Sequence, residues 1–185
     1  MPRTIANAQR ALLSALSIAA LALTAGPAVA ASGHCSAAEY RQLDFWLGNW
    51  KTYDDGGKGP YIARDEITAT LDGCVVLEQY RQNDGHHGDG VTIYDASRGL
   101  WHQTWVTNYG ELLILEGKFE GGVLTMSGSA LDKNGKRVWS RVTWNQQSTG
   151  THGVREIAVT SNDGGRSWKP AFDILFVKEQ QADRN

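Results

Sequence analysis

Apolar and polar side chains alternate along most of the chain beyond residue 45, as they do in strands with one buried face. The segment 60–71 shows this alternation most clearly. One of its faces is mostly polar and comprises Ile62, Arg64, Glu66, Thr68 and Thr70. The other comprises Tyr61, Ala63, Ile67, Ala69 and Leu71, with Asp65 among them. The pattern predicts β-structure for the body of the chain, but it does not say which face points inward.

Turn signals separate the predicted strands at intervals of roughly 11 to 17 residues. Each supplies the glycine or asparagine that a tight reversal with positive φ requires. They lie at 55–57, 72–73, 83–85, 97–99, 108–110, 120–122, 133–135, 148–150 and 163–165. This spacing is typical of an antiparallel meander and not of alternating strands and helices.

The strands expected between these turns are 46–54, 60–71, 74–83, 89–96, 99–108, 111–119, 122–131, 136–146, 152–161 and 166–178. An open sheet of ten strands would expose two edges, and closure removes both. Eight strands already enclose room for one small ligand, so ten should leave a cavity. The sequence therefore predicts an all-β protein, a single up-and-down antiparallel barrel of about ten strands.

The last predicted strand is apolar on both faces, with Phe172, Ile174 and Phe176 opposite Leu175 and Val177. We expect the core to cover one face and an N-terminal lead-in helix the other. The spacing of Ser36 and Glu39 matches a capping box, which predicts a short helix over 37–43. The aromatic segment 44–50 follows it. Gly48 and Trp50 are assigned structural roles where the first strand joins the sheet.

Residues 1–30 have the features of a secretory signal peptide: an arginine-bearing leader, an apolar run over 11–23 and a small-residue cleavage site ending at Ala30. The apolar run is shorter than the roughly 20 residues that a membrane span needs. The expected division is a signal peptide at 1–30, a lead-in at 31–45, a barrel domain at 46–180 and a disordered tail at 181–185. The mature protein is expected in the periplasm or secreted, with no membrane span.

Two cysteines, Cys35 and Cys74, remain after this leader. In an oxidising compartment they are expected to form a disulfide. Without Arg3 and Arg10, 16 of the 18 basic residues face 20 acidic ones, a net charge of −4. No basic patch is visible, so a nucleic-acid partner is not expected.

Residues 161–168 match the Asp-box pattern found in hairpins of secreted β-proteins. Asp163 is expected to accept backbone N–H bonds across the turn, with Trp168 packed beneath it. Sialidases repeat this motif several times, whereas this chain has one copy. We therefore interpret Asp163 and Trp168 as structural.

Polar residues on otherwise apolar faces are the candidates for the barrel lumen. Gln103 and Trp105 share a face with Trp101, which suits either ligand contact or plain packing, with packing favoured. Glu78 and Tyr80 share a face with Val76, so Glu78 is either a lumen carboxyl with a raised pKa or a solvent-facing residue. Arg141 could pair with Glu78 or stack over Trp50. The ligand-binding candidates are Glu78, Tyr80, Gln103, Trp105 and Arg141.

Several segments together resemble a family of bacterial exported lipocalin-like proteins without established function: 44–50, 72–74, 93–95, 101–106 and 141–144. More broadly, the Gly48-Asn49-Trp50 start after a short helix resembles the calycins, which include lipocalins, fatty-acid-binding proteins and nitrobindin-like barrels. The resemblance implies a barrel and does not imply a reaction.

Nitrobindin-like barrels hold haem through a histidine, for which only His102 or His152 would be candidates here. Neither lies in a matching motif, so no cofactor is expected and haem is a remote alternative. His86 and His87 are adjacent in a Gly- and Asp-rich turn, where a solvated loop is favoured over a metal site, and no metal is expected.

Three functions follow from a barrel with such a lumen. The first is a binding module for a small, largely apolar ligand. The second is a lumen enzyme in which Glu78 acts as general acid or base and Arg141 holds an anion. The third is a structural or interaction role in the cell envelope, favoured if there is no cavity. The ligand and the oligomeric state cannot be read from the sequence.

Overall fold

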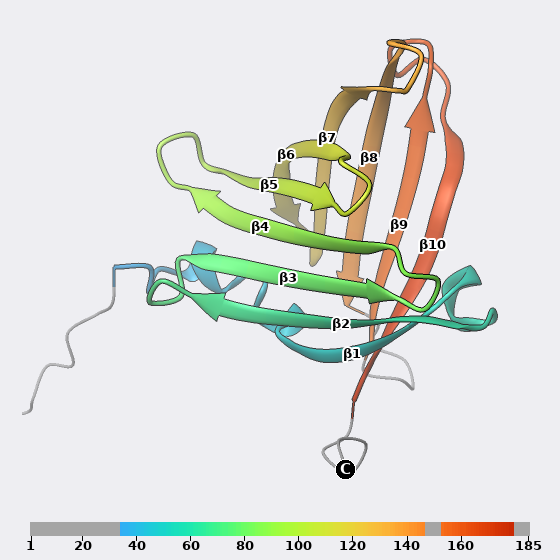
Figure 1. The fold of residues 1–185 in the computed structure, drawn as a ribbon. Helices are drawn as coiled ribbons and strands as arrows, with labels where there is room; N and C mark the ends of the chain where they lie inside the picture. The colour runs from blue at the N-terminus through green and yellow to red at the C-terminus, as the bar shows by residue number, and fades with distance from the viewer. Residues whose placement is uncertain (1–33, 147–152, 180–185) are drawn as a thin grey trace, which may run out of the picture. The chain divides into compact units, whose positions relative to one another are not determined.

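The computed structural model describes residues 34–146 and 153–179, and these form a closed barrel of ten antiparallel strands in up-and-down order (Figure 1). The strands are β1 Gly48–Tyr53, β2 Tyr61–Thr70, β3 Val75–Gln82, β4 His87–Asp95, β5 Leu100–Thr107, β6 Leu112–Glu120, β7 Val123–Leu131, β8 Arg137–Gln146, β9 Val154–Ser161 and β10 Lys169–Lys178. The predicted all-β barrel and its ten strands are confirmed. This architecture is compatible with a calycin-like fold.

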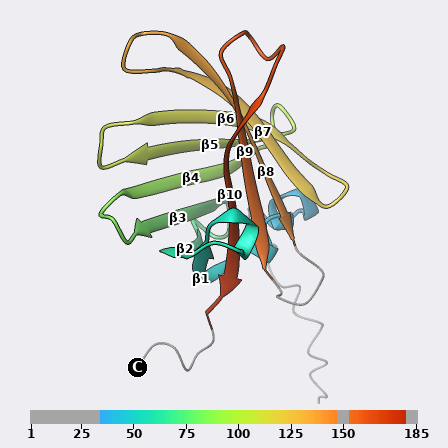
Figure 2. The same ribbon diagram turned by 90° about the vertical axis from the view of Figure 1, so that its right-hand side faces the viewer.

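The barrel closes where the first strand meets the last (Figure 2). β1 and β10 are antiparallel, with Trp50 opposite Lys178 and Tyr53 opposite Leu175. On its other side β1 pairs with β2, so its backbone groups are satisfied from both neighbours. The pairing covers the C-terminal part of β10, from Leu175 to Lys178, and joins the two edge strands of the sheet, as strand number and edge exposure favoured.

The N-terminal lead-in consists of two short 3₁₀ turns, η1 (Ala38–Arg41) and η2 (Asp44–Trp46). The predicted capping box is wrong, because the residue at the start of η1 is Ala37 and no side chain caps the turn. The predicted disulfide is confirmed: Cys35 is bonded to Cys74, with their Cα atoms 5.0 Å apart. It ties the lead-in to the β2–β3 hairpin.

The lead-in closes one end of the barrel. Leu43 and Trp46 are completely buried there, and Trp46 contacts the rings of both Trp144 and Phe176. The indole nitrogen of Trp50 donates a hydrogen bond of 2.8 Å to the carbonyl of Trp46, which joins the lead-in to β1. This aromatic packing fills the interior of the barrel next to the lead-in.

A third 3₁₀ turn, η3 (Asp55–Gly57), covers the outer face of β10. Gly57 adopts φ 94°, and a Cβ atom there would lie 2.4 Å from a methyl group of Leu175. Only glycine permits this close approach. The outer face of β10 is thus covered by η3, and the prediction that the lead-in helix covers it is wrong.

The remaining structural candidates lie at two junctions. Gly48 has φ 142°, and the side chain of Lys178 packs against it. The ammonium group of Lys178 lies 5.3 Å from the ring centroid of Trp50. In the β9–β10 hairpin, a carboxylate oxygen of Asp163 accepts hydrogen bonds from the backbone nitrogens of Arg166 and Ser167.

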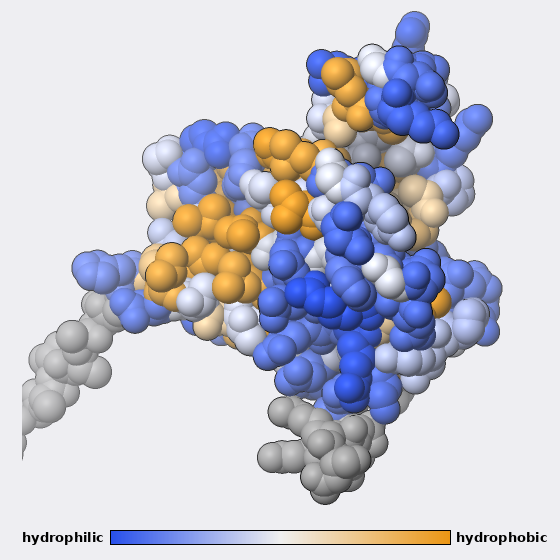
Figure 3. Space-filling view, viewed as in Figure 1, coloured by the Kyte–Doolittle hydropathy of each residue, from blue (hydrophilic) through white to orange (hydrophobic). Residues whose placement is uncertain are grey.

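Exposed aliphatic side chains gather on the outside of β4, β5 and β6, and Figure 3 shows apolar side chains over this part of the molecule. They include Val91, Ile93, Val106, Leu112 and Ile114. Val106 pairs directly with Leu112 across the sheet. Such cross-strand pairs stabilise the sheet even where one face meets water.

Among the residues described, no helix is long and apolar enough to cross a membrane.

Candidate functional site

A cavity of about 470 Å³ occupies the barrel at the end away from the lead-in. The β1–β2, β3–β4 and β5–β6 hairpins lie at this end. Residues from each hairpin, or from the strands beside it, line the cavity. Its volume is within the range of sites for small organic molecules. The predicted lumen is therefore present as a real cavity.

β3 places Glu78 and Tyr80 inside this cavity. The strand alternates so that Val76 and Glu78 are buried and Gln79 is exposed, which fixes the inward face. Glu78 is only 6% exposed and Tyr80 is half-buried. Both line the cavity, so Glu78 is the lumen carboxyl and not the solvent-facing residue.

β5 places Gln103 and Trp105 beside them. The side-chain amide of Gln103 donates a hydrogen bond of 3.3 Å to Oε2 of Glu78. The rings of Trp105 and Tyr80 meet edge to face, with centroids 6.3 Å apart. Trp101, on the same face, is buried in the core, so one strand serves both packing and the cavity lining.

Two glycines of β4 make room for these contacts. β4 lies between β3 and β5, and a Cβ atom on Gly90 would lie 2.9 Å from Oε2 of Glu78. A Cβ atom on Gly88 would lie 2.0 Å from the indole of Trp105. Glycine inside a strand commonly marks such a close approach. The two side chains therefore lie across the bare backbone of β4.

Two acidic residues that were not among the sequence candidates complete the site. Asp65, on the inward face of β2, is 2% exposed, and it pairs in register with Tyr80. Glu156, on β9, lines the cavity wall. Together with Glu78 they form what we call the acidic cluster: Asp65, Glu78 and Glu156.

Burial dominates the electrostatics of the acidic cluster. Removal from water raises the pKa of Asp65 to about 7 and that of Glu156 to about 8. It also raises the pKa of Glu78 well above its ordinary value, and the neighbouring charges of Asp65 and Glu156 add to this shift. Burial likewise raises the pKa of the Tyr80 phenol to about 12. At neutral pH the acidic cluster therefore retains protons.

Several polar atoms around the cluster lack a hydrogen-bond partner of good geometry among the described residues. They are both carboxyl oxygens of Asp65, the hydroxyl of Thr92 and the indole nitrogen of Trp144. The Asp65 carboxyl faces Glu78, and the Trp144 N–H faces Glu156 and favours its charged form. Such orphaned buried groups cost free energy, and they are typical of functional sites.

The rest of the cavity wall is apolar and aromatic. Leu113, Leu115, Val142, Ile174 and Phe172 contribute to it, with Trp105 and Trp144. Within the described part of the chain, no lysine or arginine lines the cavity. The site thus combines a largely apolar lining with two buried carboxyls, Glu78 on β3 and Glu156 on β9.

Arg141 is not in the cavity, and its predicted place there is wrong. On β8 the inward residues are the buried Val142 and Trp144, so alternation turns Arg141 outward. Its guanidinium lies over the ring of Trp168, 4.3 Å from the ring centroid. The arginine therefore belongs to the outside of the Asp-box hairpin, and Lys178 takes the position over Trp50.

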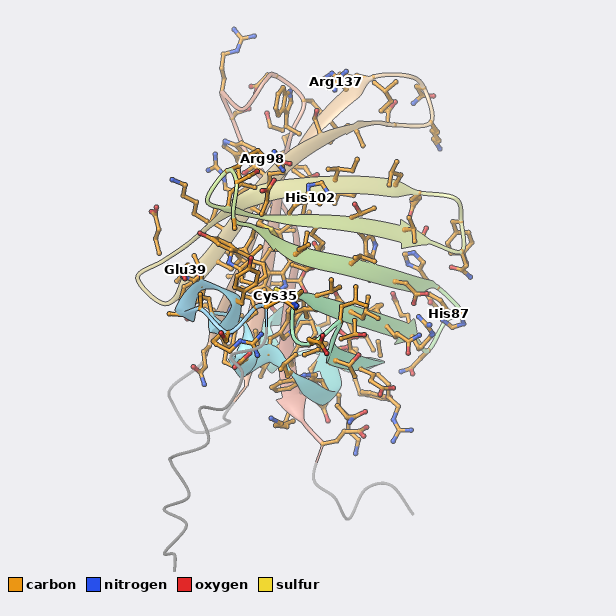
Figure 4. The ribbon with its side chains drawn as sticks, turned by 90° about the vertical axis from the view of Figure 1, so that its left-hand side faces the viewer. Cys35, Glu39, His87, Arg98, His102 and Arg137 are labelled. Atoms are coloured by element: carbon orange, nitrogen blue, oxygen red, sulfur yellow. A yellow bond between two sulfur atoms is a disulfide. The ribbon has the colours of Figure 1, made fainter. Side chains whose placement is uncertain are left out.

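The histidine candidates fall in different places. His102 faces outward, where its Nδ1 lies 2.9 Å from Glu116, which also pairs with Arg98 (Figure 4). His86 lines the cavity mouth and its ring contacts that of Tyr109, whereas His87 is exposed. His152 lies outside the described residues. Within the described ranges no three His, Cys, Asp or Glu side chains are arranged so that they could hold a metal ion, and this includes the acidic cluster. His102 is on the wrong face of β5 to hold a haem in the lumen.

Asp65 and Glu156 were not among the sequence candidates, although each interrupts an apolar face. Asp65 is the one charged residue on the apolar face of 60–71. Glu156 shares the face of its strand with the buried Val154 and Ala158. A charged residue within an apolar periodicity is the informative exception. Gly88 and Gly90, two glycines inside one strand, were a further sign of close packing.

Comparisons with models of known protein families and with curated proteins found no match to this chain.

Proposed function

We propose that the protein is an exported binding module that holds a small, largely apolar ligand in its barrel. The observation that carries this proposal is the 470 Å³ cavity, which has largely apolar and aromatic walls and a small number of polar groups contributed by β3, β5, β9 and the hairpins at its mouth. Small-molecule sites have this composition, because apolar walls supply affinity and a few polar groups fix orientation. Glu78, Tyr80, Gln103 and Trp105 would contact the ligand.

Export to the periplasm or the exterior is the second part of this proposal. It is supported by the disulfide between Cys35 and Cys74, since such bonds persist in oxidising compartments. The expected signal peptide at 1–30 lies outside the described residues. Cell fractionation of the native host, with the cleavage point read by mass spectrometry, tests this part. Retention in the cytoplasm with an intact N-terminus would contradict it.

The two alternatives lose support from the same cavity. A purely structural barrel would have a filled interior. The enzyme hypothesis needs Arg141 beside Glu78, but Arg141 lies outside the barrel over Trp168. Glu78 remains a buried carboxyl with a raised pKa, which is what a general acid needs, yet no described cation lies ready to hold an anionic substrate.

A neutral fluorescent dye, N-phenyl-1-naphthylamine, tests ligand binding directly. We expect the emission of the dye to rise when the protein is added. Extracts of the host should displace the dye and lower its emission again. Native mass spectrometry of protein purified from that host should show an added small mass.

A matched pair of variants locates the dye. Leu113 faces the cavity, whereas its neighbour Leu112 is 54% exposed on the outside. Leu113→Trp should abolish dye binding by filling the space, and Leu112→Trp, which adds the same volume outside, should leave it unchanged. Equal effects of the two variants, with both folded, would show that the dye binds elsewhere.

A further inference from the structure

We infer that the ligand is an organic amine whose ammonium group binds inside the cavity, between the carboxyls of Glu78 and Glu156, while its apolar or aromatic body fills the remaining space. This inference rests on the proposed function and names the chemical class of the ligand.

The charges around the cavity are unbalanced. Glu78 and Glu156 line the cavity, Asp65 interacts with Glu78, and Asp54 lines the cavity near its mouth. Among the described lining residues, the one side chain that can carry a positive charge is His86, also at the mouth. Buried carboxyls without a cationic partner stay protonated, and a cation brought in by a ligand would allow them to ionise.

The nearest arginine is already engaged on the outer side of the sheet. Arg81 donates hydrogen bonds to a carboxylate oxygen of Asp89, at 2.6 Å, and to the carbonyls of Tyr80 and Gly88. Its charge lowers the pKa of Asp65 through the sheet, but its donors point away from the lumen. It cannot supply the missing hydrogen bonds without leaving these partners.

The second, independent observation is the set of unfilled acceptors. Asp65 is 2% exposed, and neither of its carboxyl oxygens has a partner of good hydrogen-bond geometry among the described residues, although the Glu78 carboxyl and the backbone N–H of Glu66 lie near enough to favour its charged form. An ammonium group carries three donors and no acceptor, so it can donate to the carboxyl oxygens of Glu78 and Glu156, which line the cavity. Trp144 supports the same polarity, because its N–H faces Glu156 and favours the charged carboxylate.

The aromatic walls also suit a cation. Tyr80 and Trp105 form an edge-to-face pair beside Glu78, and Trp144 lies beside Glu156. Aromatic faces attract organic cations, most strongly where water is excluded. An amine with an aromatic or alkyl body would therefore contact carboxyls and rings together.

Binding of such a ligand must release protons. The acidic cluster holds protons near neutral pH, with pKa values of about 7 for Asp65 and about 8 for Glu156. An ammonium group stabilises the carboxylates, so protons leave to the buffer when it binds. The other ionisable groups facing the lumen are Tyr80, Asp54 and His86, with Arg81 and Asp89 on the far side of the sheet. Amine affinity should consequently rise between about pH 6 and about pH 8.

The competing possibility is that the protonated carboxyls bind an anion. Hydrogen bonds from protonated carboxyls would then hold a ligand carboxylate, and its affinity would fall as pH rises. The two possibilities predict opposite pH dependence and opposite preference between amine and acid.

Three probes that share one body separate these cases: phenethylamine, phenethyl alcohol and hydrocinnamate. We expect isothermal titration calorimetry at about pH 8 to give the tightest binding for phenethylamine, by at least about tenfold over each of the others. Titrations in two buffers of different ionisation enthalpy should show proton release with the amine alone. Equal or tighter binding of the alcohol or of hydrocinnamate would overturn the inference.

Variants place the ammonium group. Glu156→Gln should weaken phenethylamine binding by at least about tenfold and leave phenethyl alcohol within about twofold. Glu66→Gln is the matched control, because Glu66 neighbours Asp65 on β2 but is exposed on the outer face. Glu78→Gln provides a second variant if Glu156→Gln does not fold, as judged by circular dichroism. Unchanged amine affinity in a folded lumen variant would contradict the inference.

The dye separates a failure of the amine inference from a failure of the proposed binding function. If the dye binds in the lumen and phenethylamine does not, binding stands and the amine inference fails. If neither the dye nor any of the three probes binds, the binding function itself fails.

Discussion

Gln103 on β5 donates a hydrogen bond to Glu78 on β3, across the intervening strand β4, over a distance of 3.3 Å. The bond is possible because Gly90 has no side chain between them. It orients one oxygen of Glu78, while the Asp65 carboxyl faces the same residue from β2. This contact holds one carboxyl of the acidic cluster in a fixed orientation.

Stability should fall as the pH rises from about 5 to about 8. In the unfolded chain the carboxyls titrate near 4, whereas in the folded protein Asp65 and Glu156 titrate at about 7 and about 8. Between these values the folded protein holds protons that the unfolded chain has released, so the free energy of unfolding decreases with pH. Each such proton costs about 1.4 kcal/mol per pH unit, so we expect a loss on the order of 7 kcal/mol over this interval, measured by urea denaturation at a series of pH values.

The acidic cluster can be shown to cause this slope. Asp65→Asn combined with Glu156→Gln should reduce it, with Glu78 retaining a share, and Glu66→Gln should not change it. The carboxyls with lowered pKa values, those of Asp95, Glu116, Asp163 and Asp173, act below about pH 4 and do not contribute in this interval. An unchanged slope in the double variant would assign it to other groups.

Gly88→Ala should destabilise the protein by about 1–3 kcal/mol, because the new methyl group would overlap the indole of Trp105. In a Trp105→Leu background the same substitution should cost much less, since the ring is gone. A double-mutant cycle of urea midpoints measures this coupling. Equal costs in the two backgrounds would show that the effect comes from the backbone of β4 alone.

Removal of the disulfide should lower the free energy of unfolding by roughly 4 kcal/mol. Cys35 and Cys74 are 39 residues apart, and the cross-link restricts the unfolded chain over that loop. The variant Cys35→Ala with Cys74→Ala is compared with the parent protein by thermal denaturation. A reducing agent should lower the midpoint of the parent and leave that of the variant unchanged, and equal midpoints under oxidising conditions would contradict the expectation.

Arg141→Gln should leave dye and amine binding unchanged, because Arg141 stacks on Trp168 outside the barrel. We expect a cost in stability of about 0.5–1 kcal/mol from the lost contact with the ring. Trp168→Leu should cause a similar loss and make the second substitution nearly silent. A large loss of ligand affinity in Arg141→Gln would show that Arg141 contributes to ligand binding.

The alternation of side chains was sufficient to predict the strands and much of the inward surface. Glu78 with Tyr80, and Gln103 with Trp105, share the faces that period two assigned to them, and all four line the cavity. Arg141 could not be placed in the same way. Arg141 and Val142 are adjacent, and the choice of inward face depends on which of them the neighbouring strands bury.

The lead-in shows the limit of a local pattern. Ser36 and Glu39 have the spacing of a capping box, yet the chain forms two 3₁₀ turns without a side-chain cap. The disulfide at Cys35 and the burial of Leu43 and Trp46 hold this segment against the barrel end. Tertiary packing thereby overrides a preference worth about 1 kcal/mol.

The sequence by itself determined the strand number, the turns, the pairing of two cysteines and the residues that share a face. These properties depend on neighbours along the chain: the two-residue period of a strand, the glycines of tight turns and a single pair of thiols. Only the tertiary structure decided that Asp65, Glu78 and Glu156 meet, and that Arg141 does not join them. Their meeting depends on register and closure, which bring β2, β3 and β9 around one lumen, and no local pattern encodes the distance between side chains 78 residues apart, such as Glu78 and Glu156.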